Sequence, residues 1–488
     1  MPNARDTTMQ PTAIVLELPY TADELLCALL ALAPERRVQI LDSGGARGGD
    51  EARFLIAGFD PFETIEARGH ELLIQRRGDA SARVERGSLL SLLDERLARY
   101  RVARTNASTL PVAGGACIAS FSYDLARSFQ RLRSVAPPAH NAREPDAVLA
   151  FYDTLVIYDY ARSLTYIMSV AGEEQLSRAR DALREARSVS GFDAETRVDV
   201  KRRQVASNFT REEYVAAVRR IKEHIYAGDI YQANLTQQLT CTLAKGDTTE
   251  RVFLRLRREH PASFAAFLRR REDTVVSASP ERFLRVAWDD GETSRRVEAW
   301  PIKGTRARGA TAEEDARFKR ELTRSAKDAA ENVMIVDLLR NDLGRVCRYG
   351  SVEVAALCEV QVYPTLFHLV SKVRGTLCED VTAGELLRAT FPCGSITGAP
   401  KLRAMEIIDE TETVRRGLSM GAIGYFSFDG HIDLSVAIRT MTVRDGVARF
   451  NVGGGIVAES DPVSEYEESL TKARALLNAL GARVGERE

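Results

Sequence analysis

The sequence predicts an α+β protein, because strand-like and helix-like patterns both occur along it in separate stretches. Short apolar runs broken by glycine and proline fill residues 13–170, as is typical of strands. Apolar side chains at helical spacing follow Thr210. From Gly421 the pattern is that of an antiparallel meander, with Asp-Gly pairs at 429–430 and 445–446 as hairpin turns.

The length and charge of the chain narrow the possible functions. A chain of 488 residues is long enough for two lobes or for one large layered domain. Lys and Arg number 68 and Asp and Glu number 69, so the net charge is −1 and gives no general attraction to nucleic acid or to an anionic membrane. Any anion-binding site must therefore be local.

The cysteines and the N-terminal residues indicate the cellular compartment in which the protein is expected. The seven cysteines are odd in number, scattered, and free of C-x-x-C spacing, which argues against a disulfide framework or a zinc site and for a reducing compartment. The first residues lack an apolar signal core, and no later run approaches the roughly 18 apolar residues of a membrane span. We therefore expect a soluble cytoplasmic protein.

The first region of the chain, up to Val170, carries strand-like runs and no catalytic constellation. A polar, Arg-rich stretch then extends from about Glu173 to Ser207 and is most simply a solvated linker. We predict a β-rich N-terminal lobe at 1–190 and a catalytic lobe at 205–485.

Thr210 begins a predicted helix, because Glu213 three residues later completes a capping box and Gly228 ends the helical pattern. The next stretch, 231–244, alternates apolar and polar side chains as a half-buried strand does. Gln232 lies on the polar face of this strand. Two explanations of Gln232 are open: this face is directed to solvent, or Gln232 has a binding role.

Lys303 stands in the stretch W-P-I-K-G-T-R-A-R-G at 300–309. A lysine is a nucleophile only when its amine is neutral, so a catalytic Lys303 requires an enclosed site. Pro301 and Gly304 should stop regular strand pairing and hold Lys303 at a strand end. Arg306 and Arg308 are permanent cations that suit a planar anionic substrate. The alternative is a solvated Lys/Arg loop.

Several acidic residues have spacing or neighbours that could serve catalysis. Asp328 and Glu331 are three residues apart, so on a helix both carboxylates face one side, and Glu465 and Glu468 repeat this spacing. Glu281 follows a strand-like run. Taken singly, the pairs could be ordinary helix-surface charge and Glu281 could belong to an exposed ion pair at a turn.

Four long motifs together resemble those of the chorismate-utilising enzymes, over about residues 210–480 and more weakly before them. These motifs are W-P-I-K-G-T-R-A-R-G at 300–309, S-A-S-P-E-R-F at 277–283, E-N-V-M-I-V-D-L-L-R-N-D-L-G-R at 331–345 and G-S-I-T-G-A-P-K at 394–401. The resemblance implies the fold of anthranilate synthase component I: two large, mainly antiparallel β-sheets packed together, with helices on the outside. In some members the N-terminal region also carries a tryptophan pocket.

The resemblance also implies a set of roles. Chorismate would be the substrate, and Mg²⁺ would bind its ring carboxylate. Lys303 would be a covalent nucleophile and Glu281 a general acid beside the leaving hydroxyl. The implied metal ligands are Asp328, Glu331, Glu465 and Glu468, and the implied substrate-binding residues are Gln232, Thr305, His368, Ser395, Thr397, Tyr425, Arg439, Gly454, Gly455 and Lys472.

Two positions indicate the branch of the family. Members that activate water carry lysine where this chain has Gln232, and glutamine cannot act as a base, so the second reactant should be ammonia. Anthranilate synthase components carry alanine where this chain has Lys303, which favours the aminodeoxychorismate-forming branch and a path to 4-aminobenzoate and folate. The ammonia would come from a separate glutamine amidotransferase subunit. Ala307 departs from the usual proline, which could loosen the loop.

Three other readings remain open at this point. They are an anthranilate synthase component I, a water-using isochorismate or salicylate synthase, and a catalytically inactive regulatory or binding subunit that kept the fold.

Overall fold

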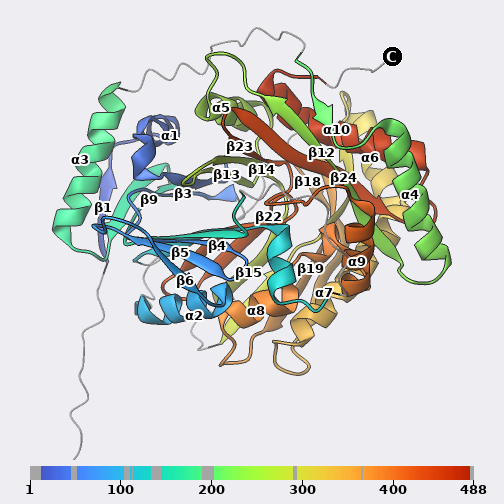
Figure 1. The fold of residues 1–488 in the computed structure, drawn as a ribbon, viewed down its shortest axis with the longest axis horizontal. Helices are drawn as coiled ribbons and strands as arrows, with labels where there is room; N and C mark the ends of the chain where they lie inside the picture. The colour runs from blue at the N-terminus through green and yellow to red at the C-terminus, as the bar shows by residue number, and fades with distance from the viewer. Residues whose placement is uncertain are drawn as a thin grey trace, which may run out of the picture.

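Two β-sheets of twelve strands each form the centre of the protein, and helices lie around them (Figure 1). The computed structural model describes residues 13–44, 52–103, 110–112, 114–132, 144–189, 203–289, 294–363 and 366–483. Within these ranges no helix is long and apolar enough to cross a membrane. The predicted α+β class with two large antiparallel sheets is confirmed.

The first sheet has the strand order β1-β10-β9-β3-β2-β13-β14-β23-β24-β12-β11, and β20 pairs with β12. Every one of these pairings is antiparallel. The strands are β1 (Ile14–Leu18), β2 (Gln39–Asp42), β3 (Phe54–Gly58), β9 (Thr154–Asp159), β10 (Leu164–Ser169), β11 (Ala206–Ser207), β12 (Gln232–Thr242), β13 (Phe264–Arg269), β14 (Thr274–Ser279), β20 (Gly398–Ala399), β23 (Thr440–Arg444) and β24 (Val447–Ile456).

The second sheet has the order β17-β19-β16-β15-β22-β21-β7-β8-β4-β5-β6, and β18 pairs with β19. It too is antiparallel throughout. The strands are β4 (Glu63–Arg68), β5 (Glu71–Arg76), β6 (Arg83–Arg86), β7 (Ala116–Phe121), β8 (Ala147–Tyr152), β15 (Arg282–Trp288), β16 (Arg295–Ala299), β17 (Ile302–Ala307), β18 (Glu353–Val362), β19 (Leu366–Thr376), β21 (Ala422–Ser427) and β22 (Ile432–Val436).

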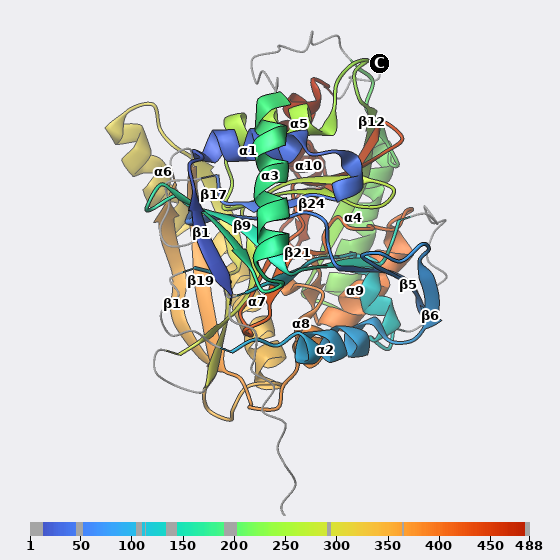
Figure 2. The ribbon, with the colours of Figure 1, turned by 90° about the vertical axis from the view of Figure 1, so that its left-hand side faces the viewer.

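The helices cover the outer faces of the two sheets (Figures 1 and 2). One buried cluster joins the first sheet to α1 (Ala22–Ala31), α3 (Glu173–Val189), α5 (Thr249–Glu259) and α10 (Pro462–Leu480). A second joins the other sheet to α2 (Leu89–Arg99), α7 (Ala326–Gly344) and α8 (Ala383–Thr390). The remaining α-helices pack at the side, α4 (Arg211–Tyr226) and α9 (Lys401–Thr411) on β12 and α6 (Ala312–Arg324) on β19.

The inner faces of the sheets pack on each other through a third buried cluster. Ile56 and Leu268 enter it from the first sheet, and Ile118 and Ile423 enter it from the second. All four side chains are nearly inaccessible to solvent. This apolar layer holds the sheets face to face by removing their inner surfaces from water.

Strands from both halves of the chain take part in both sheets. β2 pairs with β13 in the first sheet, and β7 pairs with β21 in the second. The predicted lobe boundary falls near residues 190–202, which lie outside the described ranges. The regions 1–190 and 205–485 are thus contiguous along the sequence, but each sheet runs through both of them.

The predicted helix after Thr210 is confirmed as α4, with the predicted capping box between Thr210 and Glu213. The segment 311–345 forms two helices, α6 and α7. Ser325 separates them, because its extended backbone ends α6 and its hydroxyl caps α7 by accepting from the Asp328 amide at 3.3 Å. The cap fixes the first turn of α7, which carries Asp328.

The predicted C-terminal meander is only partly correct. Both Asp-Gly turns are present, joining β21 to β22 and β23 to β24. The two hairpins, however, belong to different sheets, because β23 pairs with β14 and not with β22. The expected middle strand therefore ends at Val436, and residues 437–439 cross from one sheet to the other.

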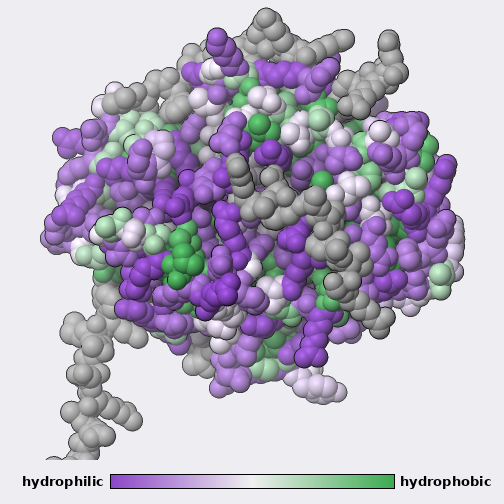
Figure 3. Space-filling view, in the orientation of Figure 1, coloured by the Kyte–Doolittle hydropathy of each residue, from purple (hydrophilic) through white to green (hydrophobic). Residues whose placement is uncertain are grey.

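Hydrophilic side chains predominate on the face of the molecule seen in Figure 3, and hydrophobic side chains form separate patches on it. Charged residues make up 28% of the chain, which fits this surface. Specific recognition therefore has to be sought in cavities.

Candidate active site

One cavity gathers most of the residues that the motifs single out. Its volume is about 480 Å³, and it lies where β12 and β24 of the first sheet face β17 and β19 of the second, beside α7 and α10. The predicted site residues that line it are Glu281, Lys303, Thr305, Asp328, Glu331, His368, Ser395, Arg439, Gly454, Gly455, Glu465, Glu468 and Lys472.

Lys303 had been expected at a strand end. It is the second residue of β17, in an irregular part of that strand. The pairing of β17 with β19 shifts register between Ile302 and Thr305, so β17 continues to Ala307 after this irregularity. Gly304 has φ +87° there, and a Cβ on it would come within 2.9 Å of the Asp328 carboxyl carbon. The bulge turns Lys303 into the cavity, where its Nζ donates to the Ser395 carbonyl at 3.1 Å.

Glu281 is buried at the floor of the cavity, with 4% of its surface exposed. Burial raises the pKa of its carboxyl, and a hydrogen bond from the Ser395 side chain and the charge of Lys303 only partly oppose this shift. Its Oε1 has no hydrogen-bond partner among the described residues. A carboxyl that keeps its proton beside an amine can donate that proton to a leaving oxygen.

His368 and Arg439 supply the side of the cavity nearest β19. Burial, reinforced by Arg439, lowers the pKa of His368 to about 3, so its imidazole is neutral, and Nδ1 lies 2.9 Å from the Thr305 hydroxyl. Arg439 stands at the crossing between the sheets with φ +49°. Within the described ranges, no side chain forms a hydrogen bond or ion pair with its guanidinium, and burial lowers its pKa. An unpaired, buried guanidinium suits a carboxylate ligand.

The four predicted metal ligands come from two helices, Asp328 and Glu331 from α7 and Glu465 and Glu468 from α10. Burial raises the pKa of Glu331, although Lys303 and Lys327 oppose this shift. Burial works in the same direction at Glu468, but there nearby lysines outweigh it and lower the pKa.

The donor chemistry of these four side chains suits Mg²⁺, which prefers hard carboxylate oxygens and normally takes only one or two from the protein. Among the described residues, no three His, Cys, Asp or Glu side chains stand in an arrangement that could hold a metal ion. The four carboxylates line a single cavity all the same. An ion here would complete its shell with water and substrate oxygens.

Three predicted substrate-binding residues do not line this cavity. Gln232 lies beneath it and is fully buried; neither polar atom of its amide has a partner among the described residues, and a Cβ on Gly455 would fall 2.0 Å from its Nε2. Thr397 is buried and donates to the Cys393 carbonyl. Tyr425 instead lines a separate cavity of about 460 Å³ and packs in the apolar layer between the sheets.

Some lining residues were not singled out by the sequence reasoning. They include Lys327, which precedes Asp328, and Asn234 and Asn451 on neighbouring strands of the first sheet. Only their positions in the sequence could have indicated them: Lys327 is next to the predicted ligand Asp328, and Asn234 shares a face of β12 with Gln232. Arg308, expected near the substrate, instead pairs with Asp315 of α6 and does not line the cavity.

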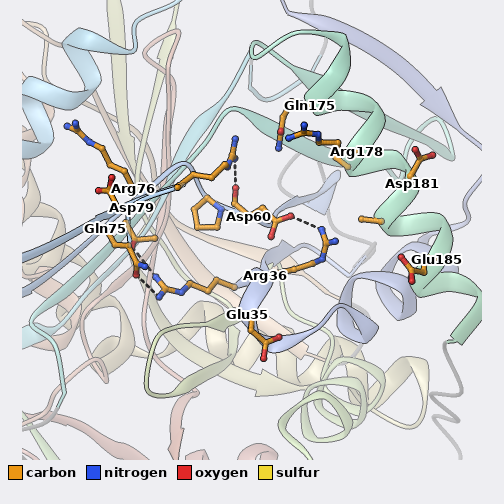
Figure 4. Close-up of a pocket in the computed structure, with 17 residues that line it drawn as sticks. Glu35, Arg36, Asp60, Gln75, Arg76, Asp79, Gln175, Arg178, Asp181 and Glu185 are labelled. Atoms are coloured by element: carbon orange, nitrogen blue, oxygen red, sulfur yellow. Dashed lines mark hydrogen bonds and ion pairs between the residues drawn. The ribbon is translucent and has the colours of Figure 1, made fainter. Parts of the chain in front are cut away.

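A wider cleft of about 640 Å³ lies between α3 and the neighbouring ends of β3, β4 and β5 (Figure 4). Acidic and basic side chains alternate around it, and Arg36 pairs with Asp60 at 2.6 Å. It contains no predicted site residue. The smaller cavity between the sheets, which gathers thirteen of the predicted site residues, is therefore the better candidate for chemistry.

Most of the chain matches a known protein family. The family model described as chorismate binding enzyme matches residues 45–478, which include every residue of the cavity. The chain is 38% identical over 473 residues to aminodeoxychorismate synthase component 1 of Escherichia coli strain K12, covering 97% of this chain and 99% of that protein.

Proteins with another name are also similar. Over 448 residues the chain is 34% identical to anthranilate synthase component 1 of Acetivibrio thermocellus, covering 89% of this chain and 88% of that one. Among solved structures, anthranilate synthase component I from Streptococcus pneumoniae TIGR4 superposes with a TM-score of 0.75 at 28% identity, over 87% of this chain and 92% of that chain. The arrangement of the two sheets is therefore the one known from anthranilate synthase component I.

Proposed function

Since the chain belongs to the chorismate binding enzyme family, we propose that it is the component of an aminodeoxychorismate synthase that converts chorismate and ammonia to 4-amino-4-deoxychorismate. Relatives of that name, similar over nearly the whole chain, support the proposal. The observation that carries it is the position of Lys303, whose amine reaches into the cavity beside the buried Glu281 and Ser395.

The proposed reaction proceeds in two displacements. The neutral amine of Lys303 attacks carbon 2 of the ring, the two conjugated ring double bonds shift toward carbon 4, and the hydroxyl on carbon 4 leaves as water with the proton of Glu281, whose carboxylate then takes the proton lost by the Lys303 nitrogen. Ammonia then attacks carbon 4, the two double bonds shift back, and the Lys303 amine leaves carbon 2 with a proton given up by the nitrogen of ammonia. Splitting one difficult substitution in this way is covalent catalysis.

The other lining residues would orient the substrate. Arg439, which has no anionic partner among the described residues, would hold one carboxylate, and the neutral His368 would pack and donate without adding charge. Mg²⁺, held by carboxylates of α7 and α10, would neutralise the ring carboxylate. The ammonia would come from a glutamine amidotransferase subunit that acts as the second component.

A specific observation also keeps anthranilate synthase as a second candidate, because relatives of that name are 33–36% identical to this chain. In that reaction ammonia itself attacks carbon 2, and no lysine nucleophile is needed. The two candidates thus differ in what Lys303 does.

The deciding experiment is to incubate the purified protein with chorismate, Mg²⁺ and ammonium, and to identify the product by mass and absorption spectrum. We expect 4-amino-4-deoxychorismate. Anthranilate as the main product would overturn the proposal in favour of the second candidate, and isochorismate would show that water is the nucleophile.

The Lys303→Ala variant tests the covalent route. We expect it to lose most amination at carbon 4, by at least about a hundredfold if covalent catalysis supplies a few kcal/mol, and to leave some anthranilate-type product. Lys245→Ala, which removes an exposed lysine after β12, is the matched control and should retain full activity. Undiminished aminodeoxychorismate formation by Lys303→Ala would rule out the lysine adduct.

A further inference from the structure

The charged side chains of the cavity balance one another. Apart from Glu281 and Lys303, which the proposed reaction uses in their neutral forms, four carboxylates and four cationic side chains line it within the described ranges. The acids are Asp328, Glu331, Glu465 and Glu468, and the cations are Arg306, Lys327, Arg439 and Lys472. A cavity that is neutral by formal charge favours neither a free cation nor a free anion, but it can accept a neutral pair of the two.

Three of the four carboxylates proposed to hold metal are paired with side-chain cations. Arg306 binds Asp328 at 3.0 Å, Lys472 binds Glu468 at 2.8 Å, and Lys327 lies 3.6 Å from Glu465. Protein cations thus already supply the positive charge that these acids require.

Lys327 differs from the other two cations in its position. It projects from α7 to a carboxylate of α10, so it bridges the two helices that carry the acid pairs. Burial opposes its charged form, but Glu465, Glu331 and Glu468 outweigh that effect and raise its pKa. One ammonium therefore feels the charge of three of the four acids.

Glu465 cannot easily be left without a cation. Its side chain is only 5% exposed, and the protein otherwise offers it a hydrogen bond of 2.6 Å from the Ser460 hydroxyl. A buried carboxylate without a counter-charge is costly. If Lys327 moves away, another cation has to take its place.

Lys327 is also the cation best able to move. Its side chain is 48% exposed, so its flexible stem can carry the ammonium into water. By contrast, Lys472 is additionally fixed by donating to the Gly453 carbonyl at 3.0 Å, and Arg306 by donating to the Thr305 carbonyl at 2.9 Å.

We propose that Lys327 is the resident counter-ion of the metal-binding carboxylates, which a divalent cation displaces from Glu465 when the dianionic substrate enters with it. This inference rests on the proposed function, since it takes the substrate to be a dicarboxylate. The dianion offsets the two positive charges of the entering cation, whereas either one alone brings charge that nothing entering with it compensates. Substrate and metal therefore bind cooperatively, and Lys327 is the origin of part of that coupling.

The test measures metal binding directly, without turnover. Isothermal titration calorimetry with MgCl₂, in the absence of ammonium, is carried out on the full-length protein and on Lys327→Met, Lys327→Gln and Lys327→Arg, each with and without chorismate. Lys319→Met is the matched control, since Lys319 is an exposed lysine of the preceding helix α6 that does not line the cavity. Thermal melting verifies that each variant is folded.

Removing the resident charge should strengthen metal binding to the free protein. We expect the Mg²⁺ dissociation constant to fall by roughly tenfold or more in Lys327→Met and Lys327→Gln, because no ammonium then competes for the Glu465 carboxylate, from which the Lys327 Nζ lies 3.6 Å away. The factor by which chorismate strengthens Mg²⁺ binding should shrink correspondingly. Lys327→Arg and Lys319→Met should behave as the unaltered protein does.

An unchanged Mg²⁺ dissociation constant in both neutral variants would overturn the proposal, as would an equal effect of Lys319→Met. Weaker Mg²⁺ binding in both neutral variants would also overturn it, since Lys327 would then help to build the site. The product assay on the unaltered protein decides the proposed function separately, because a different product leaves the metal titration interpretable.

Discussion

At the scale of single residues, the environment of Glu281 determines what its carboxyl can do. Burial raises its pKa, so it keeps its proton at a pH where an exposed glutamate has ionised. The same burial makes ionisation unfavourable for the fold. The contribution of Glu281, the proposed general acid, to the free energy of unfolding therefore depends on pH.

We predict that Glu281→Gln makes the protein inactive but more stable than the unaltered chain above the ordinary glutamate pKa of 4.5. The unfolded glutamate loses its proton near that value while the folded one retains it, so the unaltered protein loses stability as pH rises, until the raised folded-state pKa is passed. The stability difference should grow by up to about 1.4 kcal/mol per pH unit within this window. Urea unfolding between pH 4 and 8 measures it, and a difference independent of pH would contradict the prediction.

The sequence could identify a site residue where a local pattern marks it, but not where contacts with distant parts of the chain determine its position. Thirteen of the sixteen predicted site residues line the cavity, and most of these were identified by the family resemblance and not by local pattern alone. Tyr425 and Arg308 could not be placed correctly, since the cavity that Tyr425 lines and the pairing of Arg308 with Asp315 both depend on tertiary contacts. Lys327 was missed because a lysine on a helix usually faces water.

At the scale of elements, the site depends on two helices that present acid pairs to each other across the cavity. The spacing of three residues was readable from the sequence, and so was the helical pattern of both segments. The break at Ser325 was not predicted, because serine is tolerated within a helix as well as at its start. That break lets α7 begin beside β17.

We predict that Glu331→Ala and Glu465→Ala each weaken Mg²⁺ dependence and chorismate turnover together, raising the Mg²⁺ concentration for half-maximal rate by about tenfold or more, as loss of one charged ligand should. Glu467→Ala is the control, since Glu467 lies on the same helix but faces Arg211 at 3.8 Å and not the cavity. Steady-state rates at varied Mg²⁺ measure the effect. A normal metal titration in both variants would contradict the assignment of these carboxylates.

At the scale of the whole molecule, each sheet is continuous through both halves of the chain. The sequence predicted the strand content and the fold class, but not which strands share a sheet. Pairings such as Ile40 with Phe267 and Ile118 with Tyr425 join residues more than two hundred positions apart. Local sequence carries no record of such partners, and this is why the meander was expected to lie in one sheet.

We predict that a fragment ending at residue 190 does not fold by itself. Cutting there removes β13 from β2 and β21 from β7, and it opens the apolar layer between the sheets to water. Circular dichroism of the fragment should show no cooperative thermal transition, whereas the full chain, serving as the control, should show one. A fragment that melts cooperatively and gives a dispersed proton spectrum would contradict this prediction.

The crossing at residues 437–439 has a consequence for biosynthesis. β23 and β24 leave the ribosome well after β14 and β12, yet they are inserted between those two strands in the first sheet. Until then the earlier strands wait with unfilled edges, and Arg439, Gly454 and the acids of α10 do not yet exist. A nascent chain is thus without its candidate site until α10 has been made, and ribosomes that stop before α10 release a chain that lacks this cavity.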